Sequence, residues 1–160
     1  AASPLRDDSL AHAREHSIEV QLPFLQCAGG ASAFVPIALF AHDYPVCRDV
    51  GLAIAGAIRS TGRWAVVVAS TDMSHYVSRS VATTKDRKAI DAMLALDPET
   101  LHRVVRQEGI SMCGFHAATA ALVAAKTLGA TSAEFVAYTD SGEVTGDTTE
   151  VVAYAGMVIR

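Results

Sequence analysis

Cysteine is scarce in this chain of 160 residues, which holds only Cys27, Cys47 and Cys113. Three cysteines at irregular spacing are too few for a disulfide framework and do not follow the paired spacing of a zinc ribbon. Any cysteine that has a function is therefore expected to act singly.

A surplus of basic residues is also missing. The chain has 13 lysines and arginines against 17 aspartates and glutamates, which gives a net charge of −4, and both signs are scattered along it. Proteins that bind phosphate backbones concentrate positive charge in a stripe or patch. Nucleic acid is therefore not an expected partner.

Long hydrophobic runs are absent as well. Gly, Lys or Thr interrupts the apolar stretches well before the roughly 20 residues that cross a bilayer, and the opening AASPLRDDSL lacks the apolar core of a signal peptide. We therefore expect a cytoplasmic protein without a membrane partner. With 51% hydrophobic and 19% charged residues, the chain can bury the core of one soluble domain.

Apolar periodicity predicts strands that alternate with helices. The clearest strand covers residues 63–71, where the unbroken run AVVVA is typical of a central parallel strand buried on both faces. A second strand is expected over residues 32–40, and a helix around Pro23 that is short, kinked or late to start. Further helices are expected over residues 46–60, 83–96, 98–109 and 114–129, and a final pair of strands over 133–139 and 151–160. This order predicts a single α/β domain over residues 1–160, with a mixed sheet flanked by helices.

Polar side chains crowd the segment STDMSHY, which follows the predicted strand at residues 63–71. A plain turn would use Gly, Asn or Pro. Because ligands in open α/β sheets bind beyond the carboxyl ends of strands, Asp72 and His75 are candidates for a site. The residues leave a second interpretation about equally open, in which Asp72 caps the next helix and His75 lies on the surface.

Cys113 precedes the predicted helix of residues 114–129. The positive end of a helix dipole favours a thiolate, which is both a nucleophile and a soft metal ligand. The alternative is a small buried apolar residue, which is the role expected for Cys27 and Cys47. Elsewhere, Glu15 and His16 stand side by side, and such neighbours suit a loop or a helix start better than one helix face.

These stretches, in this order, resemble the Memo-like family, whose prokaryotic members are known as AmmeMemoRadiSam system protein B. The family's EHS-x-E-x-x-LPF/Y segment is matched by EHSIEVQLPF at residues 15–24, and its S-S/T-D-x-S/C-H-Y/W strand end by STDMSHY at residues 70–76. A CG at a helix start is matched by Cys113 and Gly114, and a Y-x-x-SG-x-V-x-GD loop by residues 138–147.

The resemblance implies a fold similar to that of the class III extradiol dioxygenases, which use non-haem iron. By this likeness Cys113 takes a ligand position for iron or copper, in place of a carboxylate. His75 takes the place of the acid/base histidine with Asp72 beside it, and His16 lines the substrate side. The remaining residues expected in the pocket are Glu15, Ser70, Tyr76 and Gly114.

One departure from the family pattern concerns the start of the chain. Family members carry PHAGY and GP-x-H stretches ahead of the EHS segment, which supply two metal-ligand histidines, and neither stretch occurs here. The resemblance therefore implies that this chain is the C-terminal part of a Memo-like domain and is incomplete at its N-terminus. This part alone is expected to bind metal weakly. An unpaired sheet edge would invite the missing half or a second copy as partner.

Three functions follow as hypotheses. The first is a non-haem metal-dependent oxidoreductase of the dioxygenase type that acts on an unknown small-molecule or peptide substrate. The second is a non-catalytic scaffold that binds a protein or peptide around a vestigial pocket. The third is a Cys/His hydrolase built on Cys113 with His16 or His75.

Overall fold

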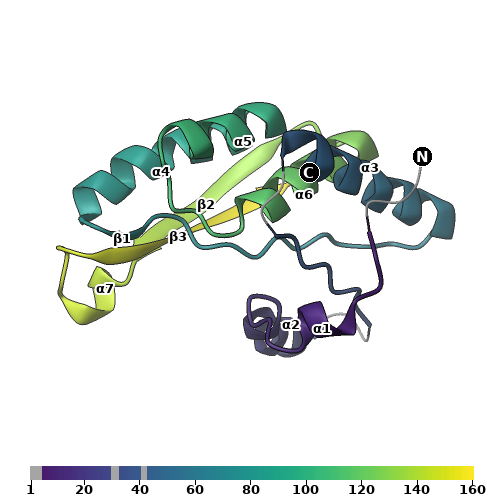
Figure 1. Ribbon diagram of the computed structural model, residues 1–160, viewed down its shortest axis with the longest axis horizontal. Coiled ribbons are helices and arrows are strands. Elements are labelled where there is room, and N and C mark those ends of the chain that lie inside the picture. Colours follow the sequence, from purple (N-terminus) through teal and green to yellow (C-terminus); the bar gives the residue numbers. More distant parts are fainter. Residues whose placement is uncertain (1–4, 30–32, 41–42) are drawn as a thin grey trace.

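The computed structural model describes residues 5–29, 33–40 and 43–160. Helices α4 and α5 lie above a narrow sheet, and a small N-terminal part with α1 and α2 lies below it (Figure 1). In chain order the elements are α1 (Ser9–His12), the 3₁₀ helix η1 (Glu19–Gln21), α2 (Leu22–Cys27), α3 (Tyr44–Thr61), β1 (His75–Val77), α4 (Arg79–Leu94), α5 (Pro98–Gln107), α6 (Phe115–Leu128), β2 (Ala133–Asp140), α7 (Gly142–Thr145) and β3 (Val151–Ile159).

The predicted helices are confirmed, and local signals explain where they begin and end. The side chain of Asp97 accepts a hydrogen bond from the Thr100 N–H at the start of α5, where Pro98 occupies the first turn. Gly129 ends α6 in the left-handed conformation that glycine tolerates best. Pro23 lies in the first turn of α2, so that helix starts late, as its sequence predicts.

The sheet has the order β1-β3-β2, and all of its pairings in the described part of the chain are antiparallel. The predicted final pair of strands is confirmed, because β2 pairs with β3 from Ala133 opposite Ile159 to Asp140 opposite Ala153. The prediction of a mixed sheet is corrected: an antiparallel sheet replaces it. The reason is that the two segments expected to supply parallel strands do not join the sheet.

Those two segments are extended but form no strand. Residues 63–71 leave Trp64 87% and Val66 64% exposed, which is the opposite of the burial on both faces that the run AVVVA predicts. Residues 33–40 likewise expose Val35 and Phe40, while residue 32 lies outside the described residues. A strand needs a neighbour to bond its N–H and C=O groups, and the described chain offers none along either segment.

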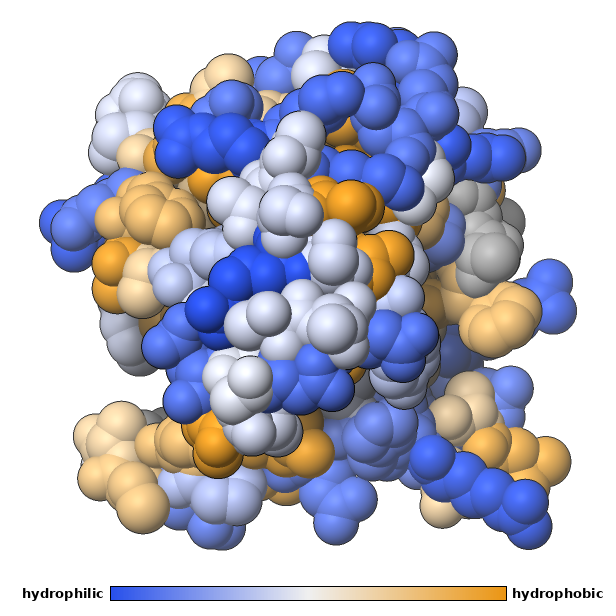
Figure 2. All heavy atoms as spheres, turned by 90° about the vertical axis from the view of Figure 1, so that its left-hand side faces the viewer, coloured by the Kyte–Doolittle hydropathy of each residue, from blue (hydrophilic) through white to orange (hydrophobic). Residues whose placement is uncertain are grey.

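The core lies on one face of the sheet, between β3 and the helices. Met73, Val151 and Ala153 are buried against Ile90 of α4 and Leu122 of α6. Helix α3 packs closely on α6, because a Cβ at Gly51 would lie only 2.5 Å from the Ala120 carbonyl oxygen. Seen from the end at which α7 lies, hydrophobic atoms also reach the surface in patches among hydrophilic ones (Figure 2).

A buried carboxyl group joins α4, β2 and the segment just before β1. Asp86 of α4 has no exposed surface, and its Oδ1 accepts hydrogen bonds from the Ser74 Oγ–H (2.6 Å) and the Ser74 N–H (3.1 Å). Its Oδ2 accepts a bond from the Tyr138 hydroxyl of β2 at 2.7 Å. Burial, and then the hydrogen bond to Asp86, raises the pKa of the Tyr138 phenol.

None of the described helices combines the length and the apolar character that a transmembrane span requires.

Tyr138→Phe should weaken this buried network. It removes one of the donors to Asp86, and leaving a buried acceptor short of a partner costs about 1–3 kcal/mol. We expect the free energy of unfolding, measured by urea denaturation at neutral pH, to fall by that amount. Tyr154→Phe is the matched control, because Tyr154 is 41% exposed. Equal changes in the two variants would contradict the role of the network.

The same phenol should make stability depend on alkaline pH. Because the pKa of Tyr138 is higher in the folded than in the unfolded chain, its contribution is complete below the unfolded pKa of about 10 and is lost as the pH rises above it. The wild-type chain should therefore lose stability more steeply than Tyr138→Phe above pH of about 10. Parallel pH profiles would contradict this account.

Candidate metal centre

Three side chains from two distant motifs converge on one point. A ligand atom from each of Asp72, His75 and Cys113 lies within 4.8 Å of the other two. Asp72 and His75 are half-buried and Cys113 is exposed. The structure therefore brings together the two motifs, about forty residues apart, that the sequence nominates independently.

The buried residues between Asp72 and His75 fix this part of the chain. The Met73 side chain is buried in the core, and the Met73 N–H donates to the Ala153 carbonyl at 2.8 Å. Ser74 is held by Asp86 and accepts a bond from the Ala153 N–H at 2.9 Å. With Met73 and Ser74 anchored inward, Asp72 and His75 are presented together at the edge of the core.

Cys113 approaches this segment closely because Gly114 follows it. A Cβ at Gly114 would lie 2.5 Å from the Ser70 carbonyl oxygen and 2.6 Å from the Thr71 Cβ, so a larger residue does not fit. The Gly114 N–H donates to Thr71 Oγ1 at 2.8 Å, and the Asp72 N–H donates to Cys113 Sγ at 3.3 Å. These contacts hold the sulfur beside the segment, one residue before the cap of α6.

The imidazole of His75 is oriented by Ser111. Its Nδ1 lies 2.7 Å from the Ser111 carbonyl oxygen, and the His75 N–H donates to Ser111 Oγ at 2.7 Å. Because a carbonyl only accepts, Nδ1 carries the proton, and the lone pair of the neutral ring is at Nε2. Nε2 lies 3.4 Å from Asp72 Oδ2, so two electron-pair donors face each other. A cation between them, either a proton or a metal ion, would relieve their repulsion.

The other predicted pocket residues lie at the margin or outside this cluster. Ser70 Oγ accepts a bond from Gln21 Nε2 at 3.1 Å, which connects the N-terminal part to the site. Tyr76 is 75% exposed and has a positive φ of 54°. Glu15 accepts a bond from the Ile18 N–H at the turn before η1, and His16 is exposed and not a member of the cluster.

Several contributors to the site carry no clear sequence signal. Ser111 orients His75 partly through its backbone carbonyl, a role that any residue type could fill. Asp86 stands in the charged run KDRK, which is typical of a solvated helix face, yet it is fully buried. Of the other cysteines, Cys47 is buried as predicted, whereas Cys27 is exposed because α2 buries none of its residues.

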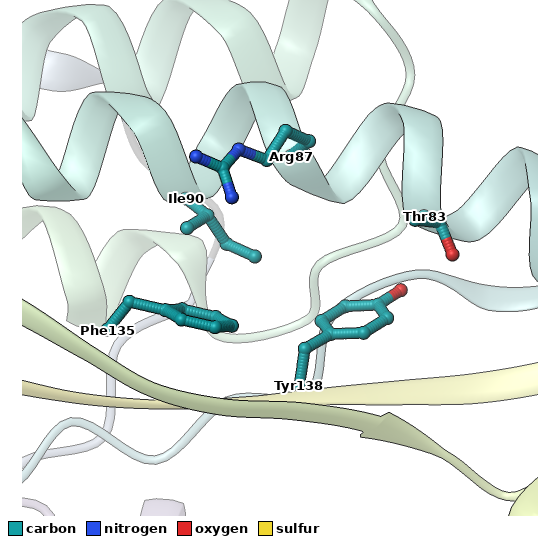
Figure 3. A pocket seen from close by; sticks show the side chains of 5 residues that line it. All are labelled: Thr83, Arg87, Ile90, Phe135 and Tyr138. Carbon is teal, nitrogen blue, oxygen red and sulfur yellow. The ribbon is translucent and has the colours of Figure 1, made fainter.

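A shallow pocket lies away from the cluster, between α4 and β2. Figure 3 shows Thr83, Arg87 and Ile90 from the helix facing Phe135 and Tyr138 from the strand. Arg87 pairs with Asp91 at 2.8 Å on the exposed side of the helix. The exposed lining is mostly apolar and holds no His, Cys, Asp or Glu that could act as a base or a metal ligand, so we assign no chemistry to this pocket.

Comparison with known proteins shows the family of this chain. A family model described as Memo-like protein matches residues 2–158. The chain belongs to the Memo-like family. The resemblance drawn from the four sequence motifs is thereby confirmed.

Relatives of this Memo-like chain include proteins of the MEMO1 family from several organisms. That of Methanopyrus kandleri is 46% identical over 155 residues, which are 96% of this chain and 55% of the relative. Those of Methanothermobacter thermautotrophicus and Methanococcoides burtonii are 40% and 42% identical, over 92% and 96% of this chain and 53% and 58% of their own lengths. The Memo-like chain thus spans about half the length of these curated relatives.

Gly114→Ala should disturb the Memo-like cluster through its backbone. The added methyl group would overlap the Ser70 carbonyl and the Thr71 side chain, and such overpacking costs about 1–3 kcal/mol. We expect a lower free energy of unfolding and a shifted NMR signal of the His75 ring. Gly56→Ala is the matched control, since nothing lies within 4 Å of a Cβ there and alanine favours a helix. If both variants behaved alike, the close approach at Gly114 would not matter.

Proposed function

We propose that this Memo-like chain supplies one wall of a redox-active metal site, for iron or copper, that resembles the site of the extradiol dioxygenases. The observation that carries the proposal is the convergence of Asp72, His75 and Cys113 within 4.8 Å. Each of these three side chains offers one atom that can serve as a metal ligand.

The thiol of Cys113 fits such a metal. A thiolate selects soft or borderline ions, among them copper(I) and the iron of iron–sulfur clusters. A catalytic transition-metal site usually has three protein ligands, and in this proposal Cys113 is the one ligand that the chain provides. The chain alone should therefore bind the ion weakly. When bound, the metal would supply the electron-transfer and oxygen chemistry that protein side chains lack.

His75 is the proposed proton-transfer group. With Nδ1 held by the Ser111 carbonyl, Nε2 is the ring atom that can take or give a proton. Asp72, at 3.4 Å, would stabilise the protonated ring and fix its direction. Ser111 and Asp72 thus hold the imidazole from both sides. The substrate, a small molecule or a peptide, would meet Nε2 from the exposed side of the cluster.

A scaffold role is the second candidate, and a separate observation favours it. Residues 33–40 and 63–71 expose large apolar side chains, among them Val35, Phe40 and Trp64, on extended backbone. Exposed apolar surface of this kind marks protein interaction sites. In this role the chain binds another polypeptide, and the cluster of Asp72, His75 and Cys113 catalyses no reaction.

Three variants separate the proposed roles. Cys113→Ala should lower copper or iron affinity more than about tenfold, because loss of a supporting group alone costs 10–100-fold. His75→Ala should keep most of the affinity but lower the rate of oxygen uptake with reduced iron by about 10²–10⁴-fold. Cys27→Ala, which removes a remote exposed thiol, should change neither. Isothermal titration and an oxygen electrode provide the two readouts.

Each role has an outcome that contradicts it. Loss of metal affinity in His75→Ala as large as in Cys113→Ala would make His75 a ligand instead of the proton-transfer group. Oxygen uptake no faster in the wild type than in Cys113→Ala, together with tight binding of a polypeptide, would favour the scaffold role.

A further inference from the structure

The shallow pocket between α4 and β2 is formed by one face of the helix and one face of the strand. Thr83, Arg87 and Ile90 share a face of α4, and Phe135 and Tyr138 form the opposite wall on β2 (Figure 3). Ile90 is buried, whereas Phe135 remains 37% exposed. The walls enclose about 120 Å³, which is close to the roughly 150 Å³ of a cavity that holds benzene. The pocket therefore has room for one small ring.

A bulge in β2 brings the two aromatic rings to the same face. Residues of a regular strand alternate between the faces of a sheet, so Phe135 and Tyr138, three positions apart, would point in opposite directions. The register with β3 shifts between Phe135 and Ala137, where β2 takes up one extra residue. Both rings consequently face α4 (Figure 3). Bulges re-aim side chains in this way beside functional sites, which favours a binding role for the pocket.

The charge at the pocket comes from Arg87, because the other residues that line it are uncharged. The Arg87 Nε–H donates to Asp91 Oδ1 at 2.8 Å, and the Nη groups make no bond within the described part of the chain. The Tyr138 hydroxyl donates to the buried carboxyl group of α4, and Thr83 Oγ1 donates to a backbone carbonyl of its own helix at 2.8 Å. The donors left for a ligand are therefore the Nη groups of Arg87, which pair best with a carboxylate.

We propose that this pocket binds a small aromatic carboxylate. The ring of the ligand lies among Ile90, Phe135 and Tyr138, since contact with two aromatic side chains favours a ring over an aliphatic chain. Its carboxylate accepts hydrogen bonds from the Nη groups of Arg87, beside Asp91. The pocket shares no residue with the candidate metal centre, so this binding function is separate from the proposed metal chemistry.

Titration followed by NMR tests the proposal, with benzoate as the probe and a chelator present so that no metal takes part. Benzoate should shift the amide signals of Arg87, Phe135 and Tyr138 and saturate with a Kd of about 1 mM, as expected for so small a ligand in an open pocket. Acetate lacks the ring, and benzyl alcohol lacks the charge. Each should bind at least about tenfold more weakly than benzoate, because each loses one of the two contacts that the pocket offers.

Variants at the pocket separate the role of Arg87 from a general loss of positive charge. Arg87→Gln should weaken benzoate binding about tenfold and leave benzyl alcohol unchanged. Arg103→Gln is the matched control, because it removes an exposed arginine of α5, and it should change neither. Asp91→Asn should strengthen benzoate binding by about threefold, since it removes the carboxylate that competes for Arg87. Phe135→Ala should weaken the binding of both ligands.

Several results would overturn the proposal. Acetate that binds as tightly as benzoate would reduce the site to a nonspecific ion contact. Shifts that leave Arg87, Phe135 and Tyr138 unaffected would place the ligand elsewhere. Unchanged benzoate affinity in Arg87→Gln, or no saturable binding up to about 20 mM, would also contradict it.

Discussion

The buried carboxyl group of Asp86 is the interaction on which the rest of the structure depends. A carboxylate without contact with water is tolerated only when its oxygens are satisfied by hydrogen bonds. Here the N–H and hydroxyl of Ser74 and the hydroxyl of Tyr138 satisfy them. Ser74 lies between Asp72 and His75 in the chain. The hydrogen bonds that permit the burial of Asp86 therefore also fix the segment that carries the Asp72 and His75 side chains.

The second constraint is steric and acts on the sulfur. Gly114 lets the start of α6 approach Ser70 and Thr71 to a distance that no side chain would permit. Cys113 is thereby brought to the Asp72 N–H, while the adjacent Ser111 directs the imidazole of His75. One short segment before α6 thus positions two of the three side chains in the cluster, and Asp86 positions the segment opposite.

Local signals were sufficient to predict the helices, since apolar periodicity, the Asp97 cap and the glycine at the end of α6 act within a few residues. The final pair of strands was predictable because both partners are close in sequence. The structure of residues 63–71 was not predictable in this way. An apolar run indicates that a segment tends to be buried, but it does not show whether a partner strand is present. Asp72 and His75 were candidates because polar groups crowd one segment, and Cys113 because it precedes a helix; the structure places the three together. The parts played by Ser111 and Asp86 depend on backbone contacts and burial that residue type does not encode.

X-ray absorption spectroscopy on the copper-loaded chain tests the central claim most directly, because it reports which atoms surround the ion. The proposed site predicts one sulfur neighbour beside nitrogen or oxygen neighbours, and loss of the sulfur shell in Cys113→Ser but not in Cys27→Ser. A copper shell without sulfur, or a sulfur shell that persists in Cys113→Ser, would contradict the assignment of the metal to this cluster.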